Sequence, residues 1–317
     1  MTTTATKPTA NPTANPTTNS PTAAPLRVGL LGTGPWASRV HGPALAAHAG
    51  VRLVGVWGRR PEAAALLAKE LGTQAYDDVE ALFDEVDAVA IALPPDVQAP
   101  LAARAARAGC HLLLDKPVAT GFEAARELAE AAAGVASVVF FTLRFSAQAG
   151  PWIEEQAGGE GWFSGRVDWI GSLYAPGVKS PYAASPWRRE RGALWDVGPH
   201  ALSVLLPVLG DVTEVTALRG PADTVQVLLR HTSGAAGSMA LSLTAPEAAA
   251  GVGAEFRGAR GVARLPEVWG DGPLASYGTA IDALVDSVRN GVAHPCDVRL
   301  GLRVTEILAQ AEAALTR

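Results

Sequence analysis

The sequence predicts an α/β protein of two domains, in which a parallel sheet flanked by helices is followed by an α+β domain with a mostly antiparallel sheet. Over residues 26–144, short aliphatic runs alternate with alanine-rich helical stretches, which is the pattern of βαβ units. From residue 145 onward, strand-like segments follow one another directly, as they do in hairpins. The length of 317 residues suits two modest domains.

The composition excludes several classes of protein. Hydrophobic residues make up 48% of the chain and charged residues 18%, which is typical of a soluble globular protein. The net charge of −5 argues against a nucleic-acid partner, and no apolar run approaches the roughly 20 residues of a membrane helix. Cys110 and Cys296 form neither a metal-ligand spacing nor a disulfide framework. We therefore expect a cytoplasmic protein with a small-molecule substrate and no metal.

The first 25 residues differ from the rest of the chain. Residues 1–25 consist almost entirely of Thr, Pro, Ala and Asn, and no aliphatic block of the kind a secretory signal needs follows Met1. Such a segment cannot bury enough surface to offset its ordering entropy. It is predicted to be a disordered tail that carries no chemistry.

The domain at residues 26–144 is predicted to be a Rossmann-like domain. Its expected strands are the aliphatic runs at 26–32, 51–58, 87–93, 110–115 and 136–141. Its expected helices lie at 61–71, 96–108 and 121–133. Strands of a parallel sheet covered on both faces are hydrophobic throughout, as these runs are.

A glycine-rich turn follows the first expected strand. The stretch "GTGPWA" at 32–37 has the spacing G-x-G-x-x-A and stands between a strand and a helix. In a dinucleotide-binding turn the first glycine allows the tight bend, the second lets the backbone approach the pyrophosphate, and the small third residue lets the helix pack closely. The candidate cofactor-binding residues here are Gly32, Thr33, Gly34, Pro35, Trp36 and Ala37.

The end of the second expected strand indicates which dinucleotide is preferred. NAD sites usually place an acidic residue there for the ribose hydroxyls, but this chain has Arg59 and Arg60 after Gly58. The planar guanidinium group suits the oxygens of a 2′-phosphate. NADP(H) is therefore favoured and NAD(H) stays open, since two arginines also occur in a loop that is merely solvated.

A lysine stands at the carboxyl end of the strand at 110–115, where open α/β sheets bind their ligands. Lys116, in "CHLLLDKPVAT", would point toward the nicotinamide half of a dinucleotide. Taken alone, it is explained equally well by a salt bridge to Asp115.

A second polar pair lies in the apolar stretch "GALWDVGPHALSVLL" at 192–206. Asp196 and His200 are four residues apart, so on a helix they share one face. Pro199 either starts a helix just after Asp196 or bends one already begun. Their structural alternatives are a helix-capping carboxylate and a core histidine bonded to a backbone carbonyl.

From Leu26 to the C-terminus the chain resembles the Gfo/Idh/MocA family of NAD(P)-dependent oxidoreductases, which act largely on sugars, inositols and related compounds. Three blocks carry the resemblance: "GLLGTGPWA", "HLLLDKP" and "GALWDVGPHALSVLL". It implies that Lys116 contacts the nicotinamide ribose and the substrate hydroxyl, and that Asp196 and His200 form part of the reaction centre. It further implies an open-faced second sheet whose free side forms a homo-oligomer, a dimer or a tetramer.

The chain departs from the family pattern at two positions. Asp115 replaces the glutamate that usually precedes the lysine. In "LPPDVQAP" at 93–100, a segment that lines the cofactor in relatives, Gln98 stands where many members have histidine. Leu93, Pro94, Gln98, Asp115 and Lys116 complete the expected cofactor site.

Reduction of a carbonyl needs a hydride from the nicotinamide and a proton for the developing alkoxide. His200 is the expected acid/base, because the unperturbed pKa of histidine, about 6.5, lies near working pH. Asp196 is expected to orient the substrate or the imidazole, and Lys116 to stabilise the oxyanion.

The sequence identifies the substrate less specifically than the cofactor. Aromatic faces stack on sugar rings, and Arg or Lys bind phosphate or carboxylate groups. The candidate contacts follow the strand at 136–141 or lie in the 177–195 segment that runs into the Asp196 block: Arg144, Phe145, Lys179, Tyr182, Trp187, Arg188 and Trp195. By family analogy, the substrate is a sugar or a nucleotide-linked keto-sugar.

The domain at residues 145–317 is expected to contain five strands and two closing helices. The strand-like segments lie at 165–174, 212–218, 224–231, 235–243 and 252–258, and the helical patterns at 278–290 and 299–315. Two other functions stay open for the whole chain. One is a non-catalytic sensor that binds the dinucleotide, and the other is imine reduction or glycoside cleavage through transient oxidation on the same scaffold.

Overall fold

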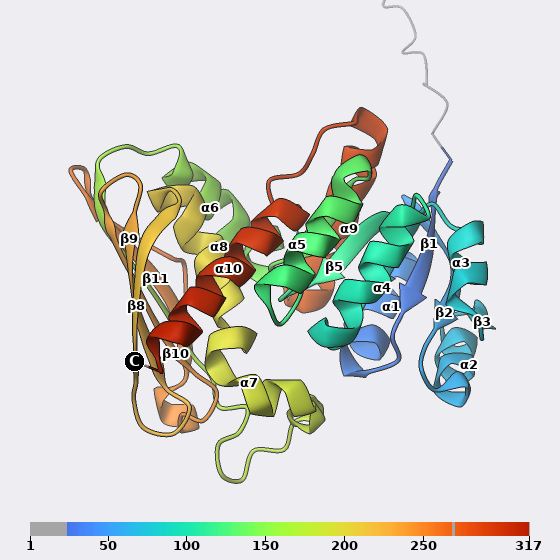
Figure 1. Ribbon diagram of the computed structural model, residues 1–317, viewed down its shortest axis with the longest axis horizontal. Helices are drawn as coiled ribbons and strands as arrows, with labels where there is room; N and C mark the ends of the chain where they lie inside the picture. Colours follow the sequence, from blue (N-terminus) through green and yellow to red (C-terminus); the bar gives the residue numbers. More distant parts are fainter. Residues whose placement is uncertain (1–23, 268–269, 317) are drawn as a thin grey trace, which may run out of the picture.

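A computed structural model describes residues 24–267 and 270–316. The predicted tail at 1–25 therefore lies, except for its last two residues, outside the described part. Figure 1 shows two sheets, one at each end of the molecule, with helices between them.

The first sheet is parallel throughout, in the order β3-β2-β1-β4-β5-β6. This confirms the predicted Rossmann-like fold. Its strands are β1 Leu26–Leu31, β2 Val51–Trp57, β3 Gln74–Tyr76, β4 Ala88–Ile91, β5 His111–Asp115 and β6 Ser137–Phe140. Every residue of β4 and β6 is buried, as expected for a sheet covered on both faces.

Short helices connect these strands. They are η1 Ala37–His41, α1 Gly42–Ala47, α2 Pro61–Glu70, α3 Val79–Glu85, α4 Pro95–Arg107 and α5 Phe122–Ala131. The sequence did not predict β3 or α3. β3 has only three residues, none of them buried, so it leaves no aliphatic run. α3 is a two-turn helix that begins where the Asp78 side chain accepts a hydrogen bond from the Glu80 amide.

The second sheet has the order β12-β11-β7-β10-β9-β8. It is mostly antiparallel, as predicted, with one parallel pair, β7 and β10. The sequence predicted five of its six strands and missed β12, which has only four residues. Its strands are β7 Trp162–Ile170, β8 Val212–Arg219, β9 Val225–His231, β10 Ala236–Ser242, β11 Gly251–Gly258 and β12 Gly261–Arg264. Burial alternates strictly along β9, so one face points inward and the other outward. Figure 1 shows helices on one side of this sheet only.

Four helices cover the inner face of the second sheet or lead up to it. They are α6 Ala149–Ala157, α7 Pro186–Asp196, α8 Gly198–Leu209 and α10 Val298–Ala314. The stretch Pro186–Leu209 is the one segment of the described chain long and apolar enough to cross a membrane, but 89% of its apolar window is buried inside the protein. It therefore has the character of a core helix.

The end of the chain returns to the first sheet. The helix α9 Pro273–Asn290 packs against β5, β6 and α1, and α10 runs from α5 to β8 (Figure 1). Two hydrogen bonds tie the connection between them to β6: the Val139 amide donates to the Cys296 carbonyl at 2.7 Å, and the Val298 amide donates to Oγ of the Ser137 side chain at 3.1 Å. The last helices therefore belong to the packing of both sheets.

Candidate active site

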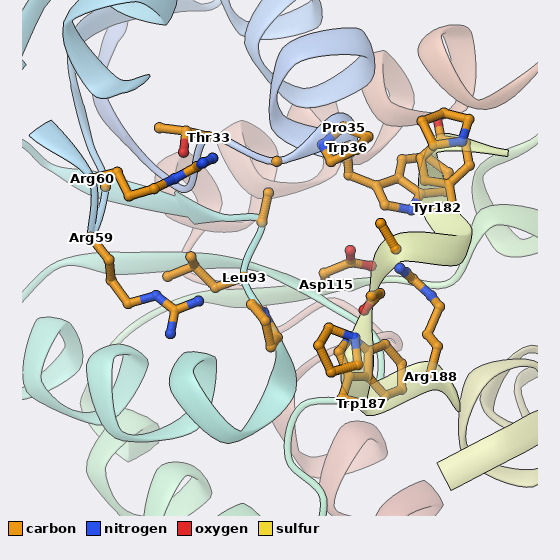
Figure 2. A pocket seen from close by; sticks show the side chains of 18 of the residues that line it. Thr33, Pro35, Trp36, Arg59, Arg60, Leu93, Asp115, Tyr182, Trp187 and Arg188 are labelled. Atoms are coloured by element: carbon orange, nitrogen blue, oxygen red, sulfur yellow. The ribbon is translucent and has the colours of Figure 1, made fainter. Parts of the chain in front are cut away.

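A cavity of about 560 Å³ lies where the glycine-rich turn, the carboxyl ends of the first sheet's strands and the segment before α7 meet. Its size is within the range usual for small-molecule and cofactor sites. Figure 2 shows Arg59 and Arg60 at one end and Tyr182, Trp187 and Arg188 at the other. Its walls consist of Thr33, Gly34, Pro35, Trp36, Gly58, Arg59, Arg60, Ala92, Leu93, Pro94, Asp115, Lys116, Pro181, Tyr182, Ala184, Ser185, Pro186, Trp187 and Arg188.

The glycine-rich turn has the form that the sequence predicts. Gly32 has φ of 129°, and a Cβ there would collide with the Ala92 carbonyl oxygen, so only glycine fits. A Cβ on Gly34 would meet nothing within 4 Å, so the space above this backbone is open to a ligand. Ala37 is fully buried at the start of η1, where its small side chain allows close packing. Gly32 and Ala37 thus shape the turn without lining the cavity.

Arg59 and Arg60 line the cavity just before α2 begins. Both side chains are exposed, and neither forms an ion pair with another residue of the described chain. No acidic residue lines this end of the cavity. The two guanidinium groups are therefore available to a ligand.

Gln98 does not line the cavity, which corrects the prediction that it contacts the cofactor. Its side chain is fully buried on α4 and is hydrogen-bonded to the backbone at the end of β5. Gln98 Nε2 donates to the Asp115 carbonyl at 2.8 Å and to the Pro117 carbonyl at 3.2 Å, while Gln98 Oε1 accepts from the Asp115 amide at 3.0 Å. The amide thereby fixes the backbone on both sides of Lys116.

Lys116 pairs with Asp196 across the two halves of the molecule. Lys116 Nζ donates to Asp196 Oδ1 at 2.8 Å and to the Asp196 carbonyl at 2.6 Å. Arg188 Nε donates to the same Oδ1 at 3.1 Å. Lys116 is 8% exposed, Asp196 6% and Arg188 9%. Burial alone would raise the pKa of Asp196, but Lys116 and Arg188 outweigh it and lower this pKa to about 2.

These contacts exclude the two structural alternatives, a helix cap at Asp196 and a salt bridge from Lys116 to Asp115. Asp196 ends α7, and α8 begins at Gly198 with Pro199 in its first turn, so Asp196 stands just before the second helix. The cap position of α8 is Val197, and no side chain caps it. Asp196 is therefore a partner of two cations and not a helix cap. Lys116 pairs with Asp196, whereas the Asp115 carboxylate accepts from the Lys116 backbone amide at 2.8 Å.

His200 lies one turn after Asp196, in the first turn of α8. It is 6% exposed, and its ring stacks on Trp169 with 4.5 Å between centroids. Nδ1 is buried and has no hydrogen-bond partner in the described chain, so a bond from this atom to a backbone carbonyl does not explain the residue. Burial, with a smaller contribution from Lys116, lowers the pKa of His200 well below 6.5. The imidazole is neutral at neutral pH.

Only three of the seven candidate substrate residues line the cavity: Tyr182, Trp187 and Arg188. Tyr182 approaches Trp36 of the glycine-rich turn, with 5.2 Å between ring centroids, and Arg188 stacks over Trp187.

The other four candidates lie elsewhere, so the prediction that they contact the substrate is not supported. Phe145 and Trp195 are core residues; Phe145 stacks on His294, and Trp195 Nε1 donates to Glu312 at 2.9 Å. Arg144 donates to the Ser203 carbonyl at 3.3 Å, and Lys179 is exposed on a loop away from the cavity wall. Conversely, the sequence did not indicate that Ala184, Ser185 and Pro186 line the cavity, because such residues carry no chemical signature.

The fold and the cavity define a two-domain protein with a Rossmann-type dinucleotide site. Residues 26–142 match the NAD-binding Rossmann-fold domain of the Gfo/Idh/MocA oxidoreductase family, and residues 165–264 match the C-terminal domain of that family. Together these matches span more than half of the chain. The chain therefore belongs to the Gfo/Idh/MocA family.

Individual relatives match over shorter stretches. A UDP-N-acetylglucosamine 3-dehydrogenase from Acidithiobacillus ferrooxidans is 38% identical over 103 residues, which is 32% of this chain and 32% of the relative. A dTDP-3,4-didehydro-2,6-dideoxy-α-D-glucose 3-reductase from Streptomyces antibioticus is 31% identical over 193 residues, 58% of this chain and 57% of the relative. The matched stretch is thus under two thirds of either relative's length.

Solved structures match over nearly the whole fold. The GenD2 protein of gentamicin A biosynthesis, in complex with NAD, superimposes with a TM-score of 0.78 at 23% identity. The match covers 92% of this chain and 94% of that protein. It confirms the fold of both domains.

Proposed function

We propose that the protein is an NADP(H)-preferring oxidoreductase that transfers a hydride between the nicotinamide and a hydroxyl or keto carbon of a sugar or sugar-like substrate. The observation that carries this proposal is Lys116, which lines a dinucleotide-sized cavity and pairs with the buried Asp196, one turn before His200. Asp196 and His200 themselves lie behind the cavity wall, since neither lines it. Relatives that act on sugar carbons support the substrate class, and a nucleotide-linked keto-sugar is included in it.

The residues present fit a dinucleotide. The open space above Gly34 admits a pyrophosphate, and Arg59 and Arg60, free of ion pairs in the described chain, would hold the 2′-phosphate of NADP(H). When bound, the nicotinamide supplies or accepts the hydride. Lys116, Asp115, Trp36 and Tyr182 would surround that half of the cofactor.

Side chains of the protein would transfer the proton and stabilise the charge that develops on the oxygen of the reacting carbon. Lys116 Nζ, held by Asp196, would stabilise the oxygen of the reacting carbon as its charge grows. Because the pKa of His200 is lowered, its neutral imidazole is ready to accept the hydroxyl proton during oxidation. In reduction, the positive charge of Lys116 makes the lysine the better placed proton donor, and solvent would supply the proton that restores its charge, because the neutral His200 has none to give.

The buried cluster also separates this proposal from a non-catalytic sensor. A sensor needs only the dinucleotide site, whereas Lys116, Asp196 and Arg188 each have at most 9% exposure and are hydrogen-bonded together. Figure 2 shows Arg188 at the opposite end of the cavity from Arg59. Burying three charged side chains costs stability. Their presence therefore supports a function that retains them. We further propose that the enzyme works in the cytoplasm on a small molecule.

The test is a titration of the purified protein with NADPH and NADH, followed by nicotinamide fluorescence, and then a screen of keto-sugars for oxidation of the preferred cofactor. We expect NADPH to bind more tightly than NADH. In the double variant Arg59→Ala/Arg60→Ala the ratio of NADPH affinity to NADH affinity should fall by about 10- to 100-fold, because hydrogen bonds to a charged phosphate are lost.

Arg52→Ala is the matched control, because Arg52 is exposed on β2 away from the cavity. It should keep the wild-type preference. A wild-type preference for NADH would refute the role of the arginine pair, and failure to bind either dinucleotide would refute the function itself.

A further inference from the structure

One buried cation at the reaction end of the cavity has hydrogen-bonding capacity that the protein does not use. We propose that Arg188 binds a carboxylate of the substrate, so that the substrate is a sugar acid or another polyhydroxy acid. This inference rests on the proposed function, because it concerns the substrate of that reaction.

The first argument is the geometry of Arg188. Its Nε donates to Asp196 Oδ1, and its guanidinium forms no other hydrogen bond with the described residues. The residue is 9% exposed and lines the cavity, and Figure 2 shows its guanidinium reaching toward Asp115. Because Nε is taken by Asp196, the two terminal amino groups present the free edge of the planar fork.

The second argument is the charge of the cluster. Lys116 Nζ and Arg188 Nε both bind one oxygen, Asp196 Oδ1. Asp115 is turned to the Lys116 backbone amide and has no ion pair within 4.0 Å in the described chain. Two buried cations therefore share one paired carboxylate. Asp115 is close enough to Lys116 and Arg188 to interact with both electrostatically, but burial raises its pKa and so favours its uncharged form. Since buried charges are stable only when paired, an anionic group of the ligand would complete the cluster.

The third argument is the shape of the group that fits. The free edge of a guanidinium offers two parallel N–H donors, which match the two oxygens of a carboxylate. A sugar hydroxyl provides a single oxygen and uses one donor well. The side walls are the rings of Trp187 and Tyr182, which suit the carbon face of a sugar. The acid group would lie within a few atoms of the carbon that reacts beside Lys116.

The experiment compares each acid with its neutral amide, so that shape is kept and charge is removed. Binding of D-glucuronate and D-glucuronamide, and of D-gluconate and D-gluconamide, is measured by calorimetry on protein loaded with NADPH, which cannot oxidise either partner. We expect at least one acid to bind about 10- to 100-fold more tightly than its amide. Glucose 6-phosphate is included to separate a carboxylate site from a phosphate site.

Variants separate recognition of the acid from simple support of Asp196. In Arg188→Gln the preference for acid over amide should fall to near unity, and Arg188→Lys, which keeps the charge without the fork, should be intermediate. If Arg188 only supported Asp196, the variant would weaken acid and amide equally and leave their ratio unchanged. Arg189→Gln is the matched control, since Arg189 is exposed and stacks on Tyr174 outside the cavity; its ratio should match that of the wild type.

Three outcomes would overturn the inference: no acid binds better than its amide, the preference survives in Arg188→Gln, or the phosphate binds best. The same comparison is repeated without dinucleotide. Loss of NADPH binding therefore counts against the proposed function alone, while the acid-to-amide ratio still tests Arg188.

Discussion

His41 is completely buried, and neither of its ring nitrogens has a hydrogen-bond partner in the described chain. It lies in η1, directly after the glycine-rich turn, and stacks on Tyr277 with 4.0 Å between ring centroids. Burial lowers the pKa of His41 from 6.5 to about 3. The residue is therefore neutral in the folded protein over a pH range in which the unfolded chain binds a proton there.

This difference predicts an acid-sensitive fold. Between pH 6.5 and about 3 the unfolded state holds one more proton at His41, so each pH unit of acidification lowers the free energy of unfolding by about 1.4 kcal/mol. His41→Phe should flatten this decline, because phenylalanine does not titrate. Urea unfolding at pH 7, 5.5 and 4.5 measures the free energy of unfolding of the wild type and of His41→Phe. All other histidines are common to both, so parallel pH curves would contradict the role of His41.

At the residue level, the sequence singled out three charged groups that the structure brings together, but it did not show how they pair. Lys116, Asp196 and Arg188 were all candidates, yet 80 residues separate the first two, and only the packed fold shows that they share one oxygen. Trp195 and Phe145 were misread for a related reason. An aromatic side chain beside a catalytic block has the same sequence signature whether it faces a core or a ligand, and burial decides.

At the level of elements, α4 and β5 are coupled through one side chain. Gln98 of α4 forms three hydrogen bonds of 2.8–3.2 Å to the backbone around Lys116. A single carboxamide is suited to this, because it donates and accepts at once.

Gln98→Leu should leave the Asp115 amide without its side-chain acceptor in a buried place, which costs about 1–3 kcal/mol of stability. It should also lower kcat more than dinucleotide affinity, because Lys116 moves while Arg59 and Arg60 do not. Ser137→Ala is the control, since it removes a comparable buried acceptor, that of the Val298 amide, at the other end of the strand layer. Thermal unfolding, NADPH titration and kcat, the last measured on the substrate that the screen identifies, distinguish Gln98→Leu from Ser137→Ala. An equal loss of kcat in both variants would show a general effect of destabilisation.

Most elements were predictable because long aliphatic or periodic stretches mark them, as in β4 and α10. Two kinds of feature were not. β3, α3 and β12 are too short to leave a pattern, and the parallel pairing of β7 with β10 joins strands that are more than 60 residues apart in sequence. Local sequence carries no information about which distant strand supplies a partner, because pairing depends on the whole layer.

At the scale of the whole molecule, the outer face of the second sheet has no helix over it (Figure 1). Leu218 of β8 and Leu228 of β9 lie on this face and are 67% and 59% exposed. Ion pairs such as Arg230–Glu214 surround them, so the face is a mixture of apolar and charged groups. We propose that two copies of the chain associate through this face.

Leu228→Glu should then convert the oligomer into monomers, because a carboxylate would be buried at the contact without a partner. Sedimentation of the wild type and the variant measures the change. Leu66→Glu, on exposed α2 of the first domain, is the matched control and should keep the wild-type mass. A monomeric wild type, or an unchanged mass of Leu228→Glu, would contradict the proposal.

The return of α9 to the first sheet bears on how the chain is made. The cover over β5 and β6 comes from Pro273–Asn290, which the ribosome synthesises more than 130 residues after β6 itself. The nucleotide-binding half therefore cannot finish folding as it emerges, although domains usually do so in order. Its apolar surface stays exposed until Pro273–Asn290 has been synthesised, and a gene cut after the first sheet would leave that surface exposed permanently.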